Sequence, residues 1–178
     1  MSDIVPVVID CLKYSLDEEA GLACVDGYDG QPKNVTIPNT IAVNGKEYRV
    51  HQINAGALKD NSSLTSITIP NSIEKIGSYA FCWCVPSLTS ITIPEGVKEI
   101  GEGAFSSCLS LASITIPNSI EKIGRYAFYK CMSLTSVEIP NGIEEIGEGA
   151  FQKCKDLTSV VIPNSVKKIG AEAFSECP

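Results

Sequence analysis

Cys82 and Cys84 lie one residue apart and flank the single tryptophan of the chain, in the stretch AFCWCVPSL. Closely spaced thiolates bind soft metal ions or exchange disulfides, so this pair is the first candidate for chemistry. A zinc site needs converging ligands, and the single histidine, His51, excludes a multi-histidine site within one chain. His51 is also the single candidate imidazole base, and no Gly-x-Ser-x-Gly elbow, phosphate loop or nucleotide-binding fingerprint accompanies it. We therefore expect no enzyme and no cofactor, and we interpret His51 as a surface histidine.

The charge and hydropathy of the chain exclude further classes of function. Its 178 residues carry a net charge of -7 at pH 7, with arginine only at Arg49 and Arg125. A nucleic-acid partner would require a basic surface, so we expect none. The early apolar run IVPVVI is too short to span a membrane, and we expect no membrane insertion. The run also lacks the basic start and the length of a secretory signal, which indicates a cytosolic chain or one supplied without its leader.

An internal repeat dominates the sequence from Leu64 to the end. Five units begin at leucines that are 23 residues apart, with one unit of 24: Leu64, Leu88, Leu111, Leu134 and Leu157. All phenylalanines occupy one position of the repeat: Phe81, Phe105, Phe128, Phe151 and Phe174. Such a period is typical of a solenoid, in which each unit, here called a rung, buries its apolar face against its neighbours.

Each rung has three predicted parts. The segment LTSITIP alternates apolar and polar residues, which predicts a half-buried strand that ends at its proline. The segment SIEKIG predicts a second short strand. The following AFxxC places Ala80, Phe81 and Cys84 on one face of a short helix or 3-10 turn. The fold class is therefore a β-rich repeat solenoid with parallel stacked strands and short helical or 3-10 turns.

The period also answers the question of the cysteine pair. Cys84 belongs to a column with one cysteine in each rung, and Asn61 takes this place in the divergent first rung: Cys84, Cys108, Cys131, Cys154 and Cys177. A straight column favours a structural ladder that bonds backbone groups over a metal site, whose ligands converge. Cys82 lies outside the column, and we interpret it as an isolated surface or half-buried thiol. The one extra residue, Val85 or Pro86, predicts a local bulge. Cys11 and Cys24 could form a disulfide if their strands are neighbours.

Charged residues alternate in sign along the predicted stack. Equivalent positions of adjacent rungs are cross-strand neighbours, and one such column reads Lys75, Glu99, Lys122, Glu145 and Lys168. Another column alternates large and small residues: Tyr79, Gly103, Tyr126 and Gly149. We predict solvated ion pairs that fix the register of near-identical rungs, with a true period near two repeats.

The first 60 residues differ from the repeats. The segments CLKYSLD and GLACVDGYDG predict two strands that meet at a turn, and Asn44-Gly45 predicts a β-hairpin. We interpret residues 1–60 as an amino-terminal β cap with a degenerate first repeat, and residues 61–178 as a five-rung array of the same continuous domain. The chain stops where a further strand would begin, which indicates a piece of a longer array or an end that a partner chain covers, for example by end-to-end self-association.

The pattern LxxIxIPxxVxxIGxxAFxxC, over about Val50 to Cys177, resembles the BspA-type leucine-rich repeat family of bacterial and protozoan surface proteins. The resemblance implies a curved solenoid with a parallel sheet, no catalytic site and a location at the cell surface or outside the cell. It also implies adhesion to a protein ligand, such as a host extracellular-matrix or cell-surface protein, or to other bacteria.

The candidate binding residues lie between the apolar positions of LTSITIP and are expected to face solvent. They are Ser66, Thr68, Ser90, Thr92, Ser113, Thr115, Ser136, Glu138, Ser159 and Val161. Serine and threonine are also good exposed strand residues, so a structural spacer or a designed consensus scaffold without a specific ligand is the alternative. A third alternative is an ice- or surface-binding hydroxyl array, which Glu138 and Val161 interrupt after three rungs.

Overall fold

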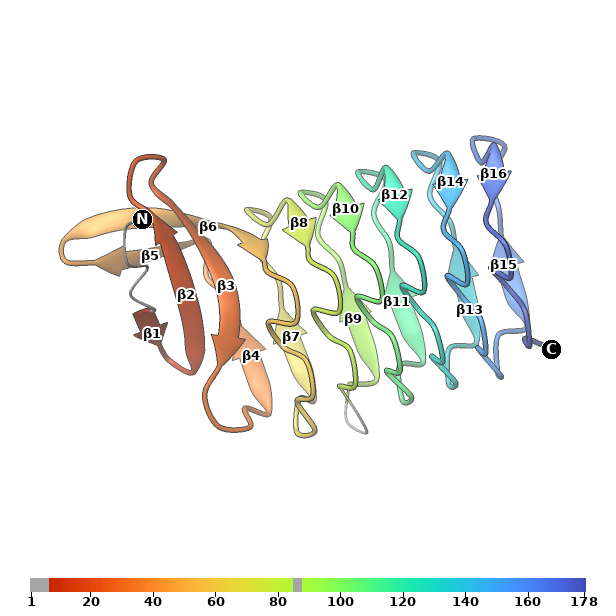
Figure 1. Cartoon of the computed structure of the whole chain (residues 1–178), viewed down its shortest axis with the longest axis horizontal. Coiled ribbons are helices and arrows are strands. Elements are labelled where there is room, and N and C mark those ends of the chain that lie inside the picture. The colour runs from red at the N-terminus through yellow and green to blue at the C-terminus, as the bar shows by residue number, and fades with distance from the viewer. Residues whose placement is uncertain (1–6, 85–87) are drawn as a thin grey trace.

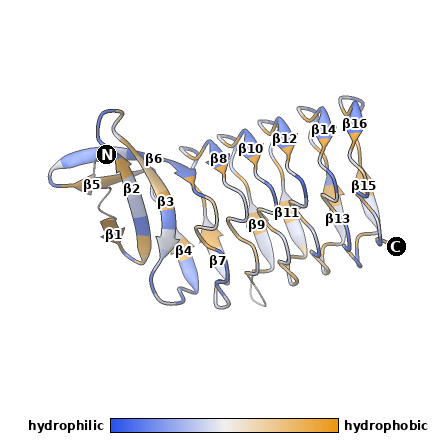
Figure 2. Cartoon of the chain, in the orientation of Figure 1, coloured by the Kyte–Doolittle hydropathy of each residue, from blue (hydrophilic) through white to orange (hydrophobic). Residues whose placement is uncertain are grey.

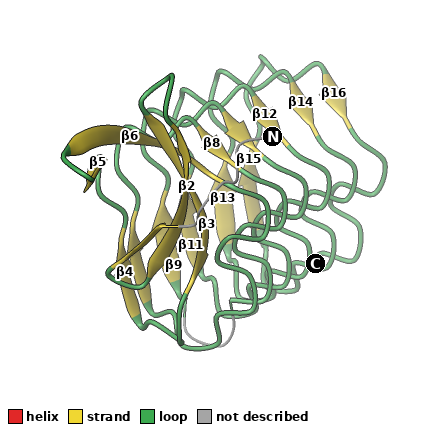
Figure 3. Cartoon of the chain, turned by 60° about the vertical axis from the view of Figure 1, so that its left-hand side comes forward, coloured by secondary structure: helices red, strands yellow, loops and turns green. Residues whose placement is uncertain are grey.

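A computed structural model describes residues 7–84 and 88–178, and this part of the chain contains strands and turns but no helix. The rungs stand side by side along one axis, with a twisted, mostly antiparallel layer at the amino-terminal end (Figures 1 and 3). The position of the predicted bulge at Val85 or Pro86 lies outside the described residues.

The amino-terminal layer contains the strands predicted from the sequence and one more. Strands β1 (Val7–Ile9), β2 (Leu12–Asp17) and β3 (Leu22–Tyr28) pair antiparallel in that order. Strands β5 (Thr40–Val43) and β6 (Lys46–Ile53) form the predicted hairpin, and Asn44 and Gly45 at its tip have φ of 53° and 80°. Positive φ at both central residues matches the twist of the strands, which explains the choice of Asn-Gly.

Each repeat contributes two strands. The first set comprises β7 (Ser66–Thr68), β9 (Ser90–Thr92), β11 (Ser113–Thr115), β13 (Ser136–Glu138) and β15 (Ser159–Val161). The second comprises β8 (Lys75–Ile76), β10 (Glu99–Ile100), β12 (Lys122–Ile123), β14 (Glu145–Ile146) and β16 (Lys168–Ile169). All inter-rung pairs are parallel, as predicted for a solenoid.

The two sets of strands form different kinds of sheet. The short second strands continue the amino-terminal layer in the order β1-β2-β3-β6-β8-β10-β12-β14-β16, and β5 adds to β6. The first strands instead pair two by two, as β9 with β11, β13 with β15, and β7 with β4 (Asn34–Thr36). The parallel side that the repeat predicts is therefore interrupted between β7 and β9 and between β11 and β13.

The AFxxC segment is a run of turns, so the prediction of a helix or 3-10 turn there was wrong. Only alternate N–H groups bond within the segment: Ala80 N donates to Gly77 O at 3.3 Å, whereas Phe81 N donates to Ala104 O of the next rung at 2.7 Å. Tyr79 and Trp83 have φ of 57° and 60°, which breaks a helical path. N–H groups that would bond within a helix therefore donate to carbonyl groups of the next rung instead.

The phenylalanine column forms the centre of the core. Neighbouring rings from Phe81 to Phe174 have centroids 5.0 to 5.4 Å apart and interplanar angles of 2° to 11°. The first four rings are fully buried. Hydrophobic segments recur from rung to rung along the chain (Figure 2). Backbones approach closely at the IG glycine: a Cβ on Gly124 would lie 2.6 Å from the carbonyl carbon of Gly101. Only glycine permits this rung spacing.

Candidate functional site

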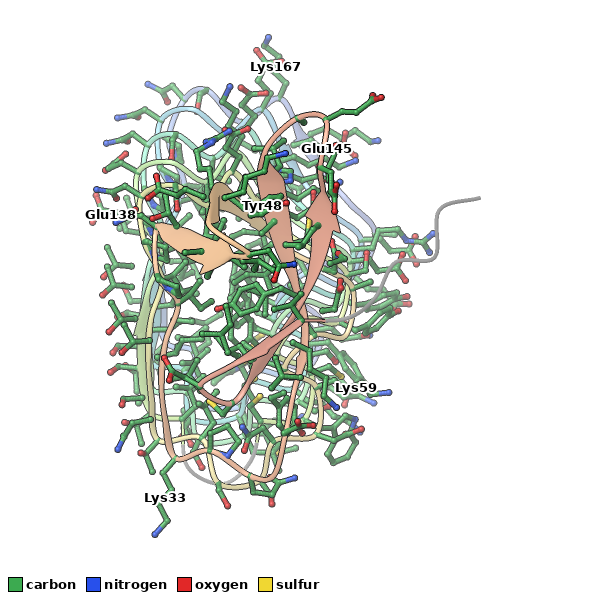
Figure 4. The ribbon with its side chains drawn as sticks, turned by 90° about the vertical axis from the view of Figure 1, so that its left-hand side faces the viewer. Lys33, Tyr48, Lys59, Glu138, Glu145 and Lys167 are labelled. Carbon is green, nitrogen blue, oxygen red and sulfur yellow. The ribbon has the colours of Figure 1, made fainter. Side chains whose placement is uncertain are left out.

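The ten predicted binding residues all lie exposed on one side of the solenoid. In β9 the pattern is exposed, buried, exposed, and the side chain between the two polar residues, Ile91, points into the core. Figure 4 shows Glu138 on this side, away from Glu145 and Lys167. We call the ten residues the strand face; the strand pleat, with a period of two residues, explains their common orientation.

Hydroxyl groups form ordered columns on the strand face. The register places Ser90 beside Ser113 and Thr92 beside Thr115. A hydroxyl donates one hydrogen bond and accepts others, so such columns can bind a ligand that presents hydrogen-bond donors or one that presents acceptors. The threonine column ends at the carboxy-terminal rungs, where Glu138 lies beside Val161, a residue that is 57% exposed.

Asn34 extends the strand face by one strand, which the sequence reasoning missed. Strand β4 pairs parallel with β7, and Asn34 Oδ1 accepts hydrogen bonds from Ser66 Oγ at 2.7 Å and Thr65 Oγ1 at 3.1 Å. The signal was present in the sequence, since VTIP at Val35–Pro38 repeats the end of LTSITIP.

A groove of about 630 Å³ adjoins the strand face at the carboxyl ends of β11, β13 and β15. Its walls are the Ile-Pro-Asn segments that end these strands, residues 116–118, 139–141 and 162–164, together with Glu95. Three strand-face residues, Thr115, Glu138 and Val161, also line it. The groove thus crosses the break between β11 and β13.

The groove is polar and carries negative charge. Glu95 and Glu138 supply carboxylates, and asparagine amides come from three rungs: Asn118, Asn141 and Asn164. Its described lining contains no lysine or arginine. The asparagine column was not singled out from the sequence, although asparagine follows the strand-ending proline in four of the five repeats.

The charged columns lie on the short-strand side and pair within the stack. The predicted register of Lys75, Glu99, Lys122, Glu145 and Lys168 is confirmed. Lys75 contacts Glu99 at 3.0 Å, and Lys168 contacts Glu145 at 2.8 Å and lowers the pKa of that carboxyl group by donating a hydrogen bond. These carboxylates therefore have structural partners.

The cysteine column is the predicted structural ladder. Each thiol donates a hydrogen bond of 3.1 or 3.2 Å to a carbonyl of the preceding rung, as Cys108 Sγ does to Phe81 O and Cys131 Sγ to Phe105 O. Burial raises the pKa of Cys84 to about 12. Asn61 is buried in the equivalent place, and its amide donates to Pro32 O.

The other cysteines do not complete a metal site. Cys82 is buried, with 5% of its surface exposed, so the prediction of a surface or half-buried thiol was wrong. Cys11 and Cys24 are both free thiols, and the open alternative of a disulfide between them is not realised. Within residues 7–84 and 88–178, no group of three or more His, Cys, Asp or Glu residues is arranged to hold a metal ion.

The stacked parallel rungs, the buried leucine and phenylalanine columns and the turn segments define a leucine-rich-repeat solenoid. Residues 51–178 match the BspA type leucine rich repeat region in six copies, and the chain belongs to this family. No curated protein matches the sequence.

Three solved structures are similar over nearly the whole chain. A leucine-rich repeat protein from Bacteroides ovatus is 34% identical, with a TM-score of 0.89 over 96% of this chain and 44% of its own. A leucine rich cell surface protein from Faecalibacterium prausnitzii is 28% identical, with a TM-score of 0.79 over 97% and 52%. A leucine rich repeat protein from T. pallidum is 27% identical, with a TM-score of 0.79 over 98% and 91%. The chain spans about half the length of the first two.

In the described part of the chain, no helix reaches the length and apolarity that crossing a bilayer requires.

Proposed function

We propose that the chain is a non-catalytic protein-interaction module of the cell-surface type, and that a protein partner binds the strand face and the adjoining groove. The observation that carries this proposal is the exposure of all ten strand-face residues on one side, beside the groove. Clefts and broad concave surfaces with convergent polar groups are where ligands bind.

The remaining surface offers weaker support for recognition. On the short-strand side the carboxylates of Glu99, Glu144 and Glu145 already contact lysines of neighbouring rungs. A partner there would have to break these pairs. The serine and threonine residues of the strand face have short side chains. Ordering these side chains when a partner binds therefore costs little conformational entropy.

The cell-surface location of a similar protein supports an extracellular partner for this chain. The similar Faecalibacterium protein is described as a cell surface protein, and this family resemblance supports the same location for the present chain. A protein ligand of the host matrix or of another cell surface is the partner class that we propose.

The test is biolayer interferometry of the full chain against a panel of extracellular-matrix and cell-surface proteins. Thr92→Lys combined with Thr115→Lys should abolish saturable binding, because two long charged side chains would cover the centre of the strand face. Glu95→Gln with Glu138→Gln removes the two carboxylates of the groove, and the same binding measurement then tests the contribution of the groove separately.

A matched control places two lysines elsewhere. Ala20→Lys with Ala171→Lys makes the same charge change at exposed positions outside the strand face and should bind normally. An equal loss of binding in the Thr92→Lys, Thr115→Lys variant and in the Ala20→Lys, Ala171→Lys control would contradict a specific site. The absence of saturable binding to every protein would favour a structural spacer without a specific ligand.

A further inference from the structure

A β-bulge in the amino-terminal layer places a histidine beside a cysteine. Strands β3 and β6 pair in parallel, with Ala23 opposite Val50 and Cys24 opposite Gln52, so the register skips His51. Val50 and Ile53 are both buried although they are three residues apart, and the intervening His51 and Gln52 are partly exposed. Bulges of this kind redirect side chains and are common next to active sites.

The redirected imidazole contacts a thiol. Cys24 Sγ and His51 Nε2 are 3.3 Å apart, within hydrogen-bond distance for sulfur, and both residues are partly exposed. A thiol donates to an unprotonated Nε2, whereas a protonated Nε2 donates to sulfur. In the tautomer with an unprotonated Nε2, this imidazole nitrogen lies where it can take the thiol proton.

No other cysteine has this environment. The five thiols of the repeat column donate to backbone carbonyls, and Cys82 is buried. Cys11 is partly exposed like Cys24, but the chain has a single imidazole and it contacts Cys24. Cys24 is therefore the one thiol that combines partial exposure with a neighbouring base.

We propose that Cys24 is a reactive thiol with His51 as its proton acceptor, and that this pair exchanges with low-molecular-weight disulfides to form a mixed disulfide on the amino-terminal layer. The site lies at β3 and β6, and its chemistry is independent of partner binding at the strand face.

The electrostatics explain why the thiol requires a base. Desolvation by burial raises the pKa of Cys24, and the negative charges of Asp26 and Asp17 raise it further, while a hydrogen bond with Ser15 acts in the opposite direction. The resting group is thus a neutral thiol. Transfer of its proton to His51 creates the thiolate, which is the nucleophile, and the resulting imidazolium stabilises the new negative charge.

The exchange step balances without an added reductant or oxidant. The Cys24 thiolate attacks one sulfur of R–S–S–R, forms an Sγ–S bond and breaks the original S–S bond. One RS⁻ leaves and takes the proton from the His51 imidazolium to become RSH. Cys24 is oxidised to the disulfide level, and half of the small disulfide is reduced to a thiol.

The test is reaction of the full, folded chain with glutathione disulfide, followed by intact-mass measurement and peptide mapping. The first adduct should map to Cys24. His51→Gln should slow its formation about tenfold or more, since a positioned base contributes at least that much to proton transfer. His51→Asn is a second variant, which replaces the imidazole with a shorter amide side chain that is not a base, and it should show the same loss.

Two controls separate reactivity from folding. Cys11→Ser removes the other partly exposed thiol of this layer and should leave the rate unchanged. In guanidinium, wild type and His51→Gln should label equally, because unfolding separates residues 24 and 51. A first adduct on Cys11 or Cys177 in the wild type, or unchanged rates in both His51 variants, would overturn the proposal.

Discussion

The ring of Tyr126 lies across Gly149 of the next rung, and its hydroxyl donates a hydrogen bond of 2.8 Å to Oε1 of Glu148. A Cβ on Gly149 would lie 2.3 Å from Cε1 of this ring. Tyr79 has the same relationship to Gly103 and Glu102, with a hydroxyl-to-carboxylate distance of 2.7 Å. The alternation of tyrosine and glycine is therefore a steric requirement between successive rungs.

Gly149→Ala should destabilise the fold by about 2 kcal/mol, because φ of +58° is strained for alanine and the methyl group meets the tyrosine ring. In a Tyr126→Ala background the loss caused by Gly149→Ala should fall to about 1 kcal/mol, because only the backbone strain at residue 149 remains once the tyrosine ring is absent. Gly21→Ala is the matched control, with φ of +65° and open space around it. Urea titrations of the double-mutant cycle measure the coupling; equal losses in both backgrounds would contradict the contact.

Phe128→Ala should cost about 3 to 5 kcal/mol, because it removes a fully buried ring from the middle of the stack. Phe174→Ala should cost less, since its ring is partly buried and contacts only one neighbour in the column. Denaturant unfolding compares the two. A loss below about 1 kcal/mol for Phe128→Ala would contradict the role of the aromatic column as core.

Stability should fall at alkaline pH because of the cysteine ladder. Burial raises the pKa of Cys108 and Cys131 well above 9.0, so both thiols stay protonated in the folded chain. The unfolded chain releases these protons above about pH 9, which favours unfolding by about 1.4 kcal/mol per pH unit for each thiol. The stabilisation is complete below pH 9 and is lost as the pH rises toward the folded pKa values.

The measurement is urea unfolding between pH 7 and 11 in a reducing buffer. A Cys108→Ala, Cys131→Ala variant should be less stable at pH 7, because it lacks two buried hydrogen-bond donors, yet should lose less stability per pH unit above 9. Parallel pH profiles for the variant and wild type would show that these thiols do not control the alkaline transition.

Residues 1–60 should be required for the stability of the repeats. Strand β6 pairs with β8 through Gln52 opposite Lys75 and Ile53 opposite Ile76, so removal of residues 1–60 would expose the β8 edge and the core beneath it. We expect a 61–178 fragment to aggregate or to bind a hydrophobic dye, as uncapped repeats do. A fragment that unfolds cooperatively with the midpoint of the full chain would contradict this boundary role.

Much of the fold was predictable because spacing alone places residues in the same column of a solenoid. The regular distance of 23 or 24 residues between phenylalanines predicted the buried stack, and the alternation from Lys75 to Lys168 predicted the register of the short strands. Asn44-Gly45 predicted the hairpin because few residue pairs adopt positive φ twice. The exposure of the strand-face residues followed from the two-residue period of a strand.

The sequence by itself therefore determined the repeat, its core columns and the side of each strand that faces solvent. The tertiary structure decided the pairing of β9 with β11 and of β13 with β15, the groove across the break, and the contact between Cys24 and His51. It also decided that AFxxC forms turns, because its N–H groups bond to the next rung. Periodicity is a property of positions along one chain, whereas these features depend on distances and hydrogen-bond choices between segments that only packing brings together.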